Sequence, residues 1–148
     1  MNELDVVEVL LVEDNPHDAE MTIRALTKGN FGHKLHWVKD GVEALDFIHC
    51  TGAYAGRHPE HQLRLVLLDL KMPRLNGLDV LRNLKTDPVT NTIPVVVMTS
   101  SNEDRDVLES HELGVNGYVQ KPVQYQLFME AVTQIGEYWL SLNQSPSR

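Results

Sequence analysis

Five polar side chains stand where apolar, strand-like segments of this sequence end. They are the carboxylates of Glu13, Asp14 and Asp69, the hydroxyl of Thr99 and the ammonium of Lys121. If those segments are parallel strands, their carboxyl ends meet at one edge of a sheet and the five side chains converge there. Clustered carboxylates repel one another unless a cation lies between them. Mg²⁺ prefers oxygen ligands and suits such a cluster, and we expect Mn²⁺ to serve as a substitute.

The same side chains suit a group that carries several negative oxygens. Asp69 is placed to attack a phosphoryl group in line, while Mg²⁺ and Lys121 neutralise its equatorial oxygens and Thr99 donates a hydrogen bond. Each residue also has an ordinary interpretation, such as an acid that stabilises a helix N-terminus. Their shared position at strand ends favours the phosphoryl-transfer interpretation, with Asp69 as phosphoacceptor and Asp69, Thr99 and Lys121 as catalytic residues.

Strand-like and helix-like segments alternate along the whole chain and would position these residues. Apolar runs predict strands at 7–12, 33–38, 64–69, 93–100 and 115–120, the second of them nearer a sheet edge. Helical periodicity predicts helices at 15–29, 40–50, 77–87, 101–114 and 122–142. This alternation predicts an α/β fold: a flavodoxin-like (βα)5 three-layer sandwich with a parallel five-stranded sheet in the order 2-1-3-4-5.

Two predicted helices and one connection have distinctive features. The helix at 101–114 has Ser101 as its predicted N-cap and a thin apolar stripe, so we expect it to be loosely anchored. Residues 51–64 break the periodicity and predict a long loop with a short helical piece. The last helix carries a strong apolar stripe, formed by Phe128, Ala131, Ile135, Trp139 and Leu142.

Composition limits the class of protein. A chain of 148 residues with 42% hydrophobic and 23% charged residues predicts one soluble domain. The single cysteine, Cys50, excludes an internal disulfide, and we expect neither a leader peptide nor a membrane span, so we predict a cytoplasmic protein. A formal net charge of -8 disfavours nucleic acid as a partner.

Four motifs together resemble the receiver domain of two-component response regulators, over nearly the whole chain. They are VLLVEDNP (9–16), LLDLKMPRLNG (67–77), VVVMTSS (95–101) and GYVQKP (117–122). The resemblance implies a single receiver domain over 1–148, with a core at about 6–142 and no output domain. It also implies a signalling protein that catalyses only its own phosphorylation and dephosphorylation, not a metabolic enzyme.

The resemblance implies roles for individual residues. Asp69 would receive its phosphoryl group from a phosphohistidine of a sensor histidine kinase. Mg²⁺ would be bound by Glu13, Asp14, Asp69 and the backbone carbonyl of Lys71, while Thr99 and Lys121 contact the phosphoryl group. The peptide bond before Pro122 would be cis.

The resemblance also implies a switch. Tyr118 would move inward as Thr99 shifts toward the phosphoryl group, and this would change the surface of the fourth helix, fifth strand and fifth helix. Lys71 and Ser101 lie two residues after Asp69 and Thr99, beside the path of attacking water. We expect them to tune the rate of dephosphorylation.

The loop at 51–64 and the EYWLSL end (137–142) resemble single-domain regulators that partner phytochrome-type histidine kinases in bacteria. The receiver family implies kinase docking through the first helix, at His17, Glu20, Met21 and Arg24. The subgroup implies a homodimer face at Tyr138, Trp139 and Leu142, although the same residues would serve equally well to cap the core of the monomer. The resemblance also implies a downstream target that recognises the phosphorylated form.

Other functions fit the sequence less well. A phosphorelay intermediate or a phosphate sink would have the same residues, and a phosphate-independent pseudo-receiver would not need the complete set. Phosphatases of the haloacid dehalogenase type need a second acid two residues after the nucleophile, where this chain has Lys71. A dinucleotide-binding fold needs a glycine-rich turn after its first strand, and EDNPHD (13–18) contains no glycine.

Overall fold

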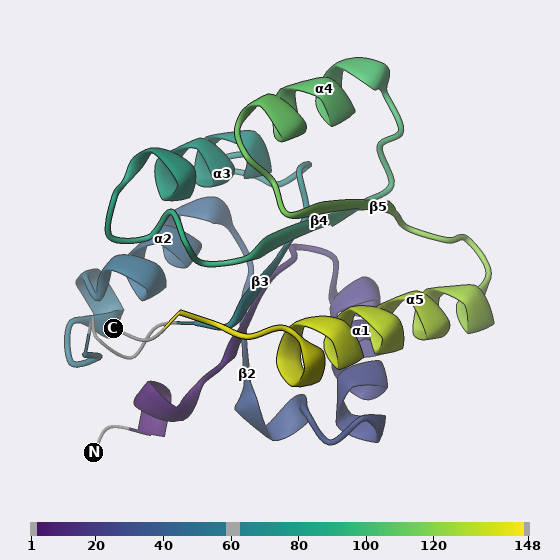
Figure 1. Ribbon diagram of the computed structural model, residues 1–148, viewed down its shortest axis with the longest axis horizontal. Helices are drawn as coiled ribbons and strands as arrows, with labels where there is room; N and C mark the ends of the chain where they lie inside the picture. Colours follow the sequence, from purple (N-terminus) through teal and green to yellow (C-terminus); the bar gives the residue numbers. More distant parts are fainter. Residues whose placement is uncertain (1–2, 59–62, 147–148) are drawn as a thin grey trace.

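The computed structural model describes residues 3–58 and 63–146, and within them the predicted order of strands is confirmed (Figure 1). All pairings in the sheet are parallel, and the strand order is β2-β1-β3-β4-β5. The strands are β1 (Val9–Val12), β2 (Leu35–Val38), β3 (Leu65–Leu68), β4 (Val95–Thr99) and β5 (Gly117–Gln120). The helices are α1 (Pro16–Lys28), α2 (Gly41–His49), α3 (Gly77–Thr86), α4 (Asp104–Glu112) and α5 (Tyr125–Glu137).

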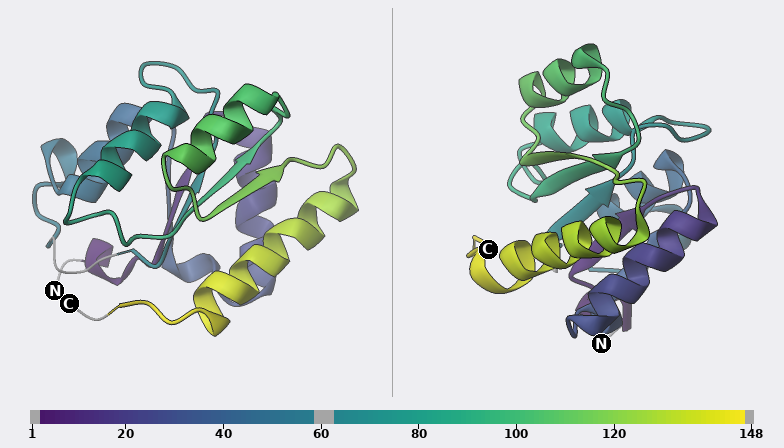
Figure 2. Two further views of the ribbon diagram at one scale, coloured as in Figure 1. Left: turned by 45° about the horizontal axis from the view of Figure 1, so that its top comes forward. Right: turned by 90° about the vertical axis from the view of Figure 1, so that its right-hand side faces the viewer.

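The sheet is the middle of three layers. Helices α1 and α5 cover one face, and α2, α3 and α4 lie on the other (Figures 1 and 2). Alternate strand residues point to opposite faces, so Val9 and Leu11 join the core under α1 and α5, whereas Leu10 and Val12 join the core under α2 and α3. Within the described residues, no helix has the length and apolar character that crossing a bilayer requires.

The observed strands are shorter than the predicted ones, and at β2 a turn occupies the predicted start. A 3-10 turn (Glu3–Val6) precedes β1, and another (Gly32–Lys34) precedes β2. The predicted edge position of β2 is confirmed. The predicted loop at 51–64 contains a 3-10 turn (Gly52–Tyr54), and its residues 59–62 lie outside the described part of the chain.

Helix α4 begins later than predicted. Ser101 is not its N-cap: the helix starts after Glu103, and no side chain caps it in the described structure. The Ser101 hydroxyl donates instead to the carboxylate of Asp106, 2.6 Å away. The predicted thin apolar stripe is confirmed, since the buried residues of α4 are the polar Asp106 and Ser110.

The predicted stripe of the last helix is wrong at its end. Helix α5 ends at Glu137, and a π-helical turn (Tyr138–Leu142) follows it. A π-helical turn has more residues per turn than an α-helix, so a different side chain faces the core. Leu140 is buried, whereas Leu142 is 72% exposed. The guanidinium of Arg64 stabilises this turn by donating to the carbonyl of Leu140 at 2.8 Å.

Candidate functional site

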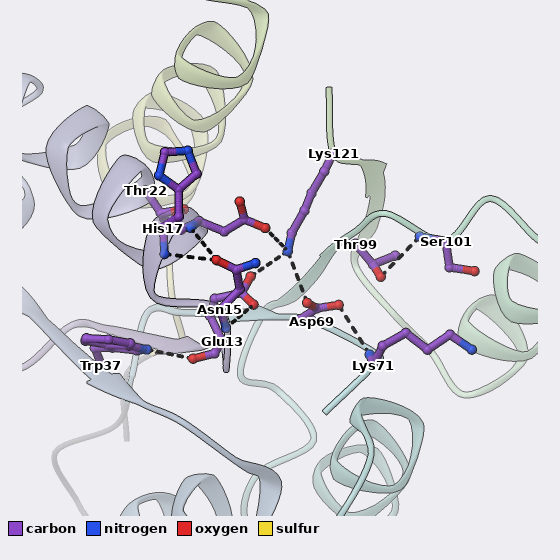
Figure 3. Close-up of polar contacts among 11 residues, drawn as sticks. Glu13, Asn15, His17, Thr22, Trp37, Asp69, Lys71, Thr99, Ser101 and Lys121 are labelled. Atoms are coloured by element: carbon purple, nitrogen blue, oxygen red, sulfur yellow. Dashed lines mark hydrogen bonds and ion pairs between the residues drawn. The ribbon is translucent and has the colours of Figure 1, made fainter. Parts of the chain in front are cut away.

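The structure brings Glu13, Asp69, Thr99 and Lys121 together at the carboxyl edge of the sheet (Figure 3). Backbone hydrogen bonds continue the strand pairing past the strand ends and fix the first residues of the loops there. The amide of Asp69 donates to the carbonyl of Val12 at 3.1 Å, and the amide of Lys121 donates to the carbonyl of Thr99 at 2.7 Å. Because β3 and β4 are neighbours in the sheet, these bonds hold Asp69 and Lys121 near each other, although they are far apart in sequence.

The ammonium of Lys121 is the centre of the site. Its Nζ lies 2.6 Å from Oε1 of Glu13, 3.1 Å from Oδ2 of Asp69 and 2.8 Å from Oδ2 of Asp18. The Lys121 side chain is 10% exposed, so these contacts are shielded from water. Asp18 is not among the predicted site residues, so its proximity to Lys121 was missed. Its position one turn after the Asn15 cap, facing the same sheet edge, was the available signal.

One lysine cannot neutralise all of the carboxylates around it, and the pKa values show this imbalance. Burial and the charge of Asp69 raise the pKa of Glu13 to about 7, although Lys121 opposes that shift. Burial disfavours the charge of Lys121, but hydrogen bonds to Asp18 and Glu13 outweigh burial and raise its pKa. Lys121 is therefore firmly charged, and the acid cluster around it retains excess negative charge.

The donor set of the site fits a hard divalent cation. Glu13, Asp14 and Asp69 each offer one carboxylate oxygen, and these oxygens lie within 4.8 Å of one another. Glu13 and Asp69 are buried, whereas Asp14 is exposed and faces water. A set of oxygen ligands with access to water is what Mg²⁺ and Mn²⁺ bind.

The loop after Asp69 is held close to α3. The amide of Gly77 donates to the carbonyl of Leu70 at 2.9 Å, and a Cβ atom at position 77 would lie 2.3 Å from the carbonyl oxygen of Asp69. Only glycine permits this approach. The amide of Lys71 donates to Oδ1 of Asp69 at 3.3 Å, which orients the carboxylate. A role for the Lys71 carbonyl as a metal ligand stays a prediction.

The residues of the predicted switch lie along β4 and β5. Thr99 is fully buried, and its hydroxyl oxygen accepts a long hydrogen bond of 3.4 Å from the amide of Ser101. The hydroxyl of Tyr118, a half-buried residue, donates to the carbonyl of Ser101 at 3.0 Å. The expected cis peptide bond before Pro122 is wrong, because no described peptide bond is cis. Lys121 points into the site with a trans peptide bond.

The predicted interaction surfaces are only partly exposed. On α1, His17, Glu20 and Arg24 face solvent, while Met21 packs partly against the core under α1 and α5. On the π-helical turn, Tyr138 is 50% exposed and Trp139 packs partly against the same core. Trp139 therefore covers the monomer core, while Tyr138 and Leu142 face outward, and a homodimer face at this turn stays a prediction.

The site has almost no enclosed volume. The cavity that touches Glu13, Asp69 and Lys121 measures about 10 Å³, which is room for about one water molecule. A substrate of metabolite size would not be enclosed there, and a reacting group has to approach Asp69 from solvent at the sheet edge.

Trp37 on β2 is placed to report the predicted binding of a metal ion. Its indole Nε1 donates to the backbone carbonyl of Glu13 at 2.7 Å. We expect Mg²⁺ to change Trp37 emission in a saturable way, because a cation at the Glu13 carboxylate alters the field and position of that residue. The measurement is a fluorescence titration of the Trp139→Phe variant, in which Trp37 is the remaining tryptophan.

A matched pair of variants tests the predicted metal ligand Asp14. Asp14→Asn should shift the Mg²⁺ titration to higher concentration, whereas Asp104→Asn, at an exposed acid of α4, should not. Emission of Trp37 that stays constant while calorimetry records Mg²⁺ binding would refute the coupling to Glu13.

Comparisons with known proteins agree on one family. The model of the response regulator receiver domain matches residues 9–133. The probable methanogenesis regulatory protein FilR2 of Methanothrix harundinacea is 37% identical over 138 residues, which cover 93% of this chain and 86% of FilR2. Response regulator Rcp1 of Synechocystis sp. is 35% identical over 132 residues, which cover 89% of this chain and 88% of Rcp1.

Solved structures give the same result. The crystal structure of the Mn²⁺-bound form of Rcp1 matches with a TM-score of 0.87 and 34% identity, over 94% of this chain and 98% of that one. The phosphorylated cyanobacterial phytochrome response regulator RcpA matches with a TM-score of 0.87 and 36% identity, over 94% of this chain and 97% of that one. The acid cluster, its lysine and the five-stranded parallel sheet therefore have a common explanation: this chain belongs to the family of response regulator receiver domains.

Proposed function

We propose that this receiver domain accepts a phosphoryl group on Asp69 from a phosphohistidine of a sensor histidine kinase, in a reaction that requires Mg²⁺ or Mn²⁺. The observation that carries this proposal is the position of Asp69. Its carboxylate lies 3.1 Å from the Lys121 ammonium and within 4.8 Å of carboxylate oxygens from Glu13 and Asp14.

The proposed step is an in-line displacement. An oxygen of Asp69 forms a bond to phosphorus as the bond between phosphorus and the imidazole nitrogen breaks, and that nitrogen keeps the electron pair. Lys121 holds a phosphoryl oxygen with its ammonium, and the Thr99 hydroxyl donates a hydrogen bond to another. A cation held by Glu13, Asp14, Asp69 and the Lys71 carbonyl would supply further positive charge for the phosphoryl oxygens.

We further propose a readout and partners. Phosphorylation would shift Thr99 and Tyr118 and change the surface formed by α4, β5 and α5. A kinase of the phytochrome type would dock on α1 at His17, Glu20, Met21 and Arg24, and the similarity to RcpA, a phytochrome response regulator, supports that choice of kinase. The exposed Tyr138 and Leu142, with Trp139 between them, support a homodimer face at the π-helical turn.

The test of the proposed function uses a small phosphodonor. We expect the chain to gain one phosphoryl group when it is incubated with acetyl phosphate and Mg²⁺, because Lys121 and a cation bound to the acids would together supply the positive charge that the transfer needs. Intact mass spectrometry measures the gain. Chelation of the metal should abolish it, and Mn²⁺ should restore it.

Purified phytochrome-type kinase, autophosphorylated beforehand, is the second donor. Failure of both donors to modify the chain in the presence of Mg²⁺ would favour a phosphate-independent pseudo-receiver. Transfer from Asp69 onward to a further histidine protein would identify a phosphorelay intermediate, and rapid hydrolysis without onward transfer would indicate a phosphate sink.

A further inference from the structure

Asp106, on the first turn of α4, is a buried carboxylate that joins segments around the acceptor site. Its Oδ2 accepts a hydrogen bond of 2.6 Å from the Ser101 hydroxyl and lies 3.5 Å from the Lys71 ammonium. The Asp106 side chain is only 5% exposed. The hydrogen bond from Ser101 and the nearby ammonium of Lys71 favour a charged carboxylate at this buried position.

The two residues that contact Asp106 each follow a residue of the acceptor site by the same number of positions in the sequence. Lys71 comes two residues after Asp69, and Ser101 comes two residues after Thr99. The backbone carbonyl of Ser101 also accepts the hydrogen bond from Tyr118. One carboxylate on α4 is thus connected to the acceptor loop, to the loop after β4 and, through Ser101, to β5.

Besides the contacts of Asp106, helix α4 is joined to α3 by an ion pair of 3.2 Å between Glu109 and Arg82, whose side chains are both partly exposed. Among the described residues, no side chain caps its N-terminus, and the buried hydroxyl of Ser110 has no hydrogen-bond partner. Ser110 lies one helical turn after Asp106, on the same side of α4. The contacts of Asp106 with Ser101 and Lys71 therefore help to hold a helix whose other buried polar side chain, Ser110, has no hydrogen-bond partner.

We propose that Asp106 is a positioning residue that holds the Lys71 ammonium on the α4 side of the site and so shortens the lifetime of the phosphoryl group on Asp69. This inference rests on the proposed phosphorylation of Asp69. The Lys71 side chain is 61% exposed, so its contact with Asp106 selects one position for a long side chain that is otherwise free to move through solvent.

The direction of the effect follows from charge. A phosphoryl group on Asp69 brings negative oxygens next to the Lys71 backbone, and they compete with Asp106 for the Lys71 ammonium. If Asp106 is neutral, the ammonium moves to the phosphoryl group and lies across the approach of the attacking water. Hydrolysis of the acyl phosphate is then slower.

The test is a double-mutant cycle on the rate of dephosphorylation. The chain is phosphorylated with acetyl phosphate and Mg²⁺ and the donor is removed. Intact mass spectrometry then follows the decay for the wild type, Asp106→Asn, Lys71→Ala and the double variant. We expect Asp106→Asn to slow the decay about threefold or more when Lys71 is present and to have no effect when position 71 is alanine. Asp104→Asn, which removes an acid from the same turn of α4, should decay like the wild type.

The outcomes separate this inference from the proposed function. A purely structural role of Asp106 would change the decay equally with and without Lys71, and that result would overturn the inference, as would a decay of Asp106→Asn equal to that of the wild type. If the wild type takes up no phosphoryl group from either donor, the proposed function fails and this inference fails with it. Asp106→Gln provides a second neutral variant if Asp106→Asn does not fold.

Discussion

Asp69→Asn is expected to abolish phosphoryl uptake without loss of stability. Asparagine keeps the shape of the side chain and can still accept a hydrogen bond from Lys121, but its amide oxygen is not an ionised nucleophile. The substitution also removes one negative charge from a cluster in which Lys121 faces the carboxylates of Glu13, Asp18 and Asp69. We therefore expect the free energy of unfolding, measured in urea with chelator present, to be unchanged or up to about 1 kcal/mol higher.

Two measurements check this prediction together. Intact mass after incubation with acetyl phosphate and Mg²⁺ reports uptake, and urea denaturation reports stability. The matched control is Asp104→Asn, an exposed acid of α4, which should take up phosphoryl like the wild type. An Asp69→Asn variant that is phosphorylated as fully as the wild type would show that another residue is the acceptor.

Lys121→Met should have the opposite effect on stability. The substitution keeps a long apolar chain but leaves Glu13, which is 3% exposed, beside Asp69 and Asp18 without their shared cation. Removing one partner of a buried ion pair costs about 3 kcal/mol or more. Phosphoryl uptake should fall by about 100-fold or more, because the removed charge would stabilise the transferring group.

Added Mg²⁺ distinguishes a charge effect from a packing effect in Lys121→Met. A cation bound to the acids replaces part of the lost positive charge, so Mg²⁺ should stabilise this variant more than it stabilises the wild type. The control is Lys34→Met, which removes a partly exposed lysine 3.5 Å from Glu8 and should change the free energy of unfolding by less than about 1 kcal/mol. A Lys121→Met variant as stable as the wild type in the presence of chelator would contradict the described charge balance.

The residues at the strand ends could be predicted because two simple rules place them. Buried parallel strands have a recognisable apolar pattern, and their carboxyl ends lie at one edge of the sheet. Asp69 and Lys121, 52 positions apart, were therefore expected to meet, and the 3.1 Å contact confirms it. The rules depend on the pattern of each segment alone, and each of these segments has a clear pattern.

Asp18 and Asp106 could not be predicted in the same way. An acid in the first turn of a helix has an ordinary explanation, and the contact of Asp18 with Lys121 joins residues 103 positions apart. Asp106 occupies a buried position of α4 where the periodicity anticipates an apolar residue. Its burial depends on Ser101 and Lys71, which reach it from two other segments.

The ends of helices were also set by contacts that the pattern does not contain. The π-helical turn after α5 depends on Arg64, whose guanidinium donates to the carbonyls of Leu140 and Asn143 from a segment 76 or more positions away. A periodic apolar stripe gives no sign of that anchor, so Leu142 was assigned to the core that Leu140 occupies.

The acceptor assignment is tested most directly by borohydride reduction of the phosphorylated chain, followed by peptide mass mapping. Borohydride converts an aspartyl acyl phosphate to homoserine and leaves free carboxylates intact, so the product marks the acceptor itself. We predict homoserine at position 69 and at no other acid, in an amount equal to the phosphoryl uptake measured before reduction. Homoserine at Asp14 or Asp18 instead, or none after demonstrated uptake, would contradict the role of Asp69.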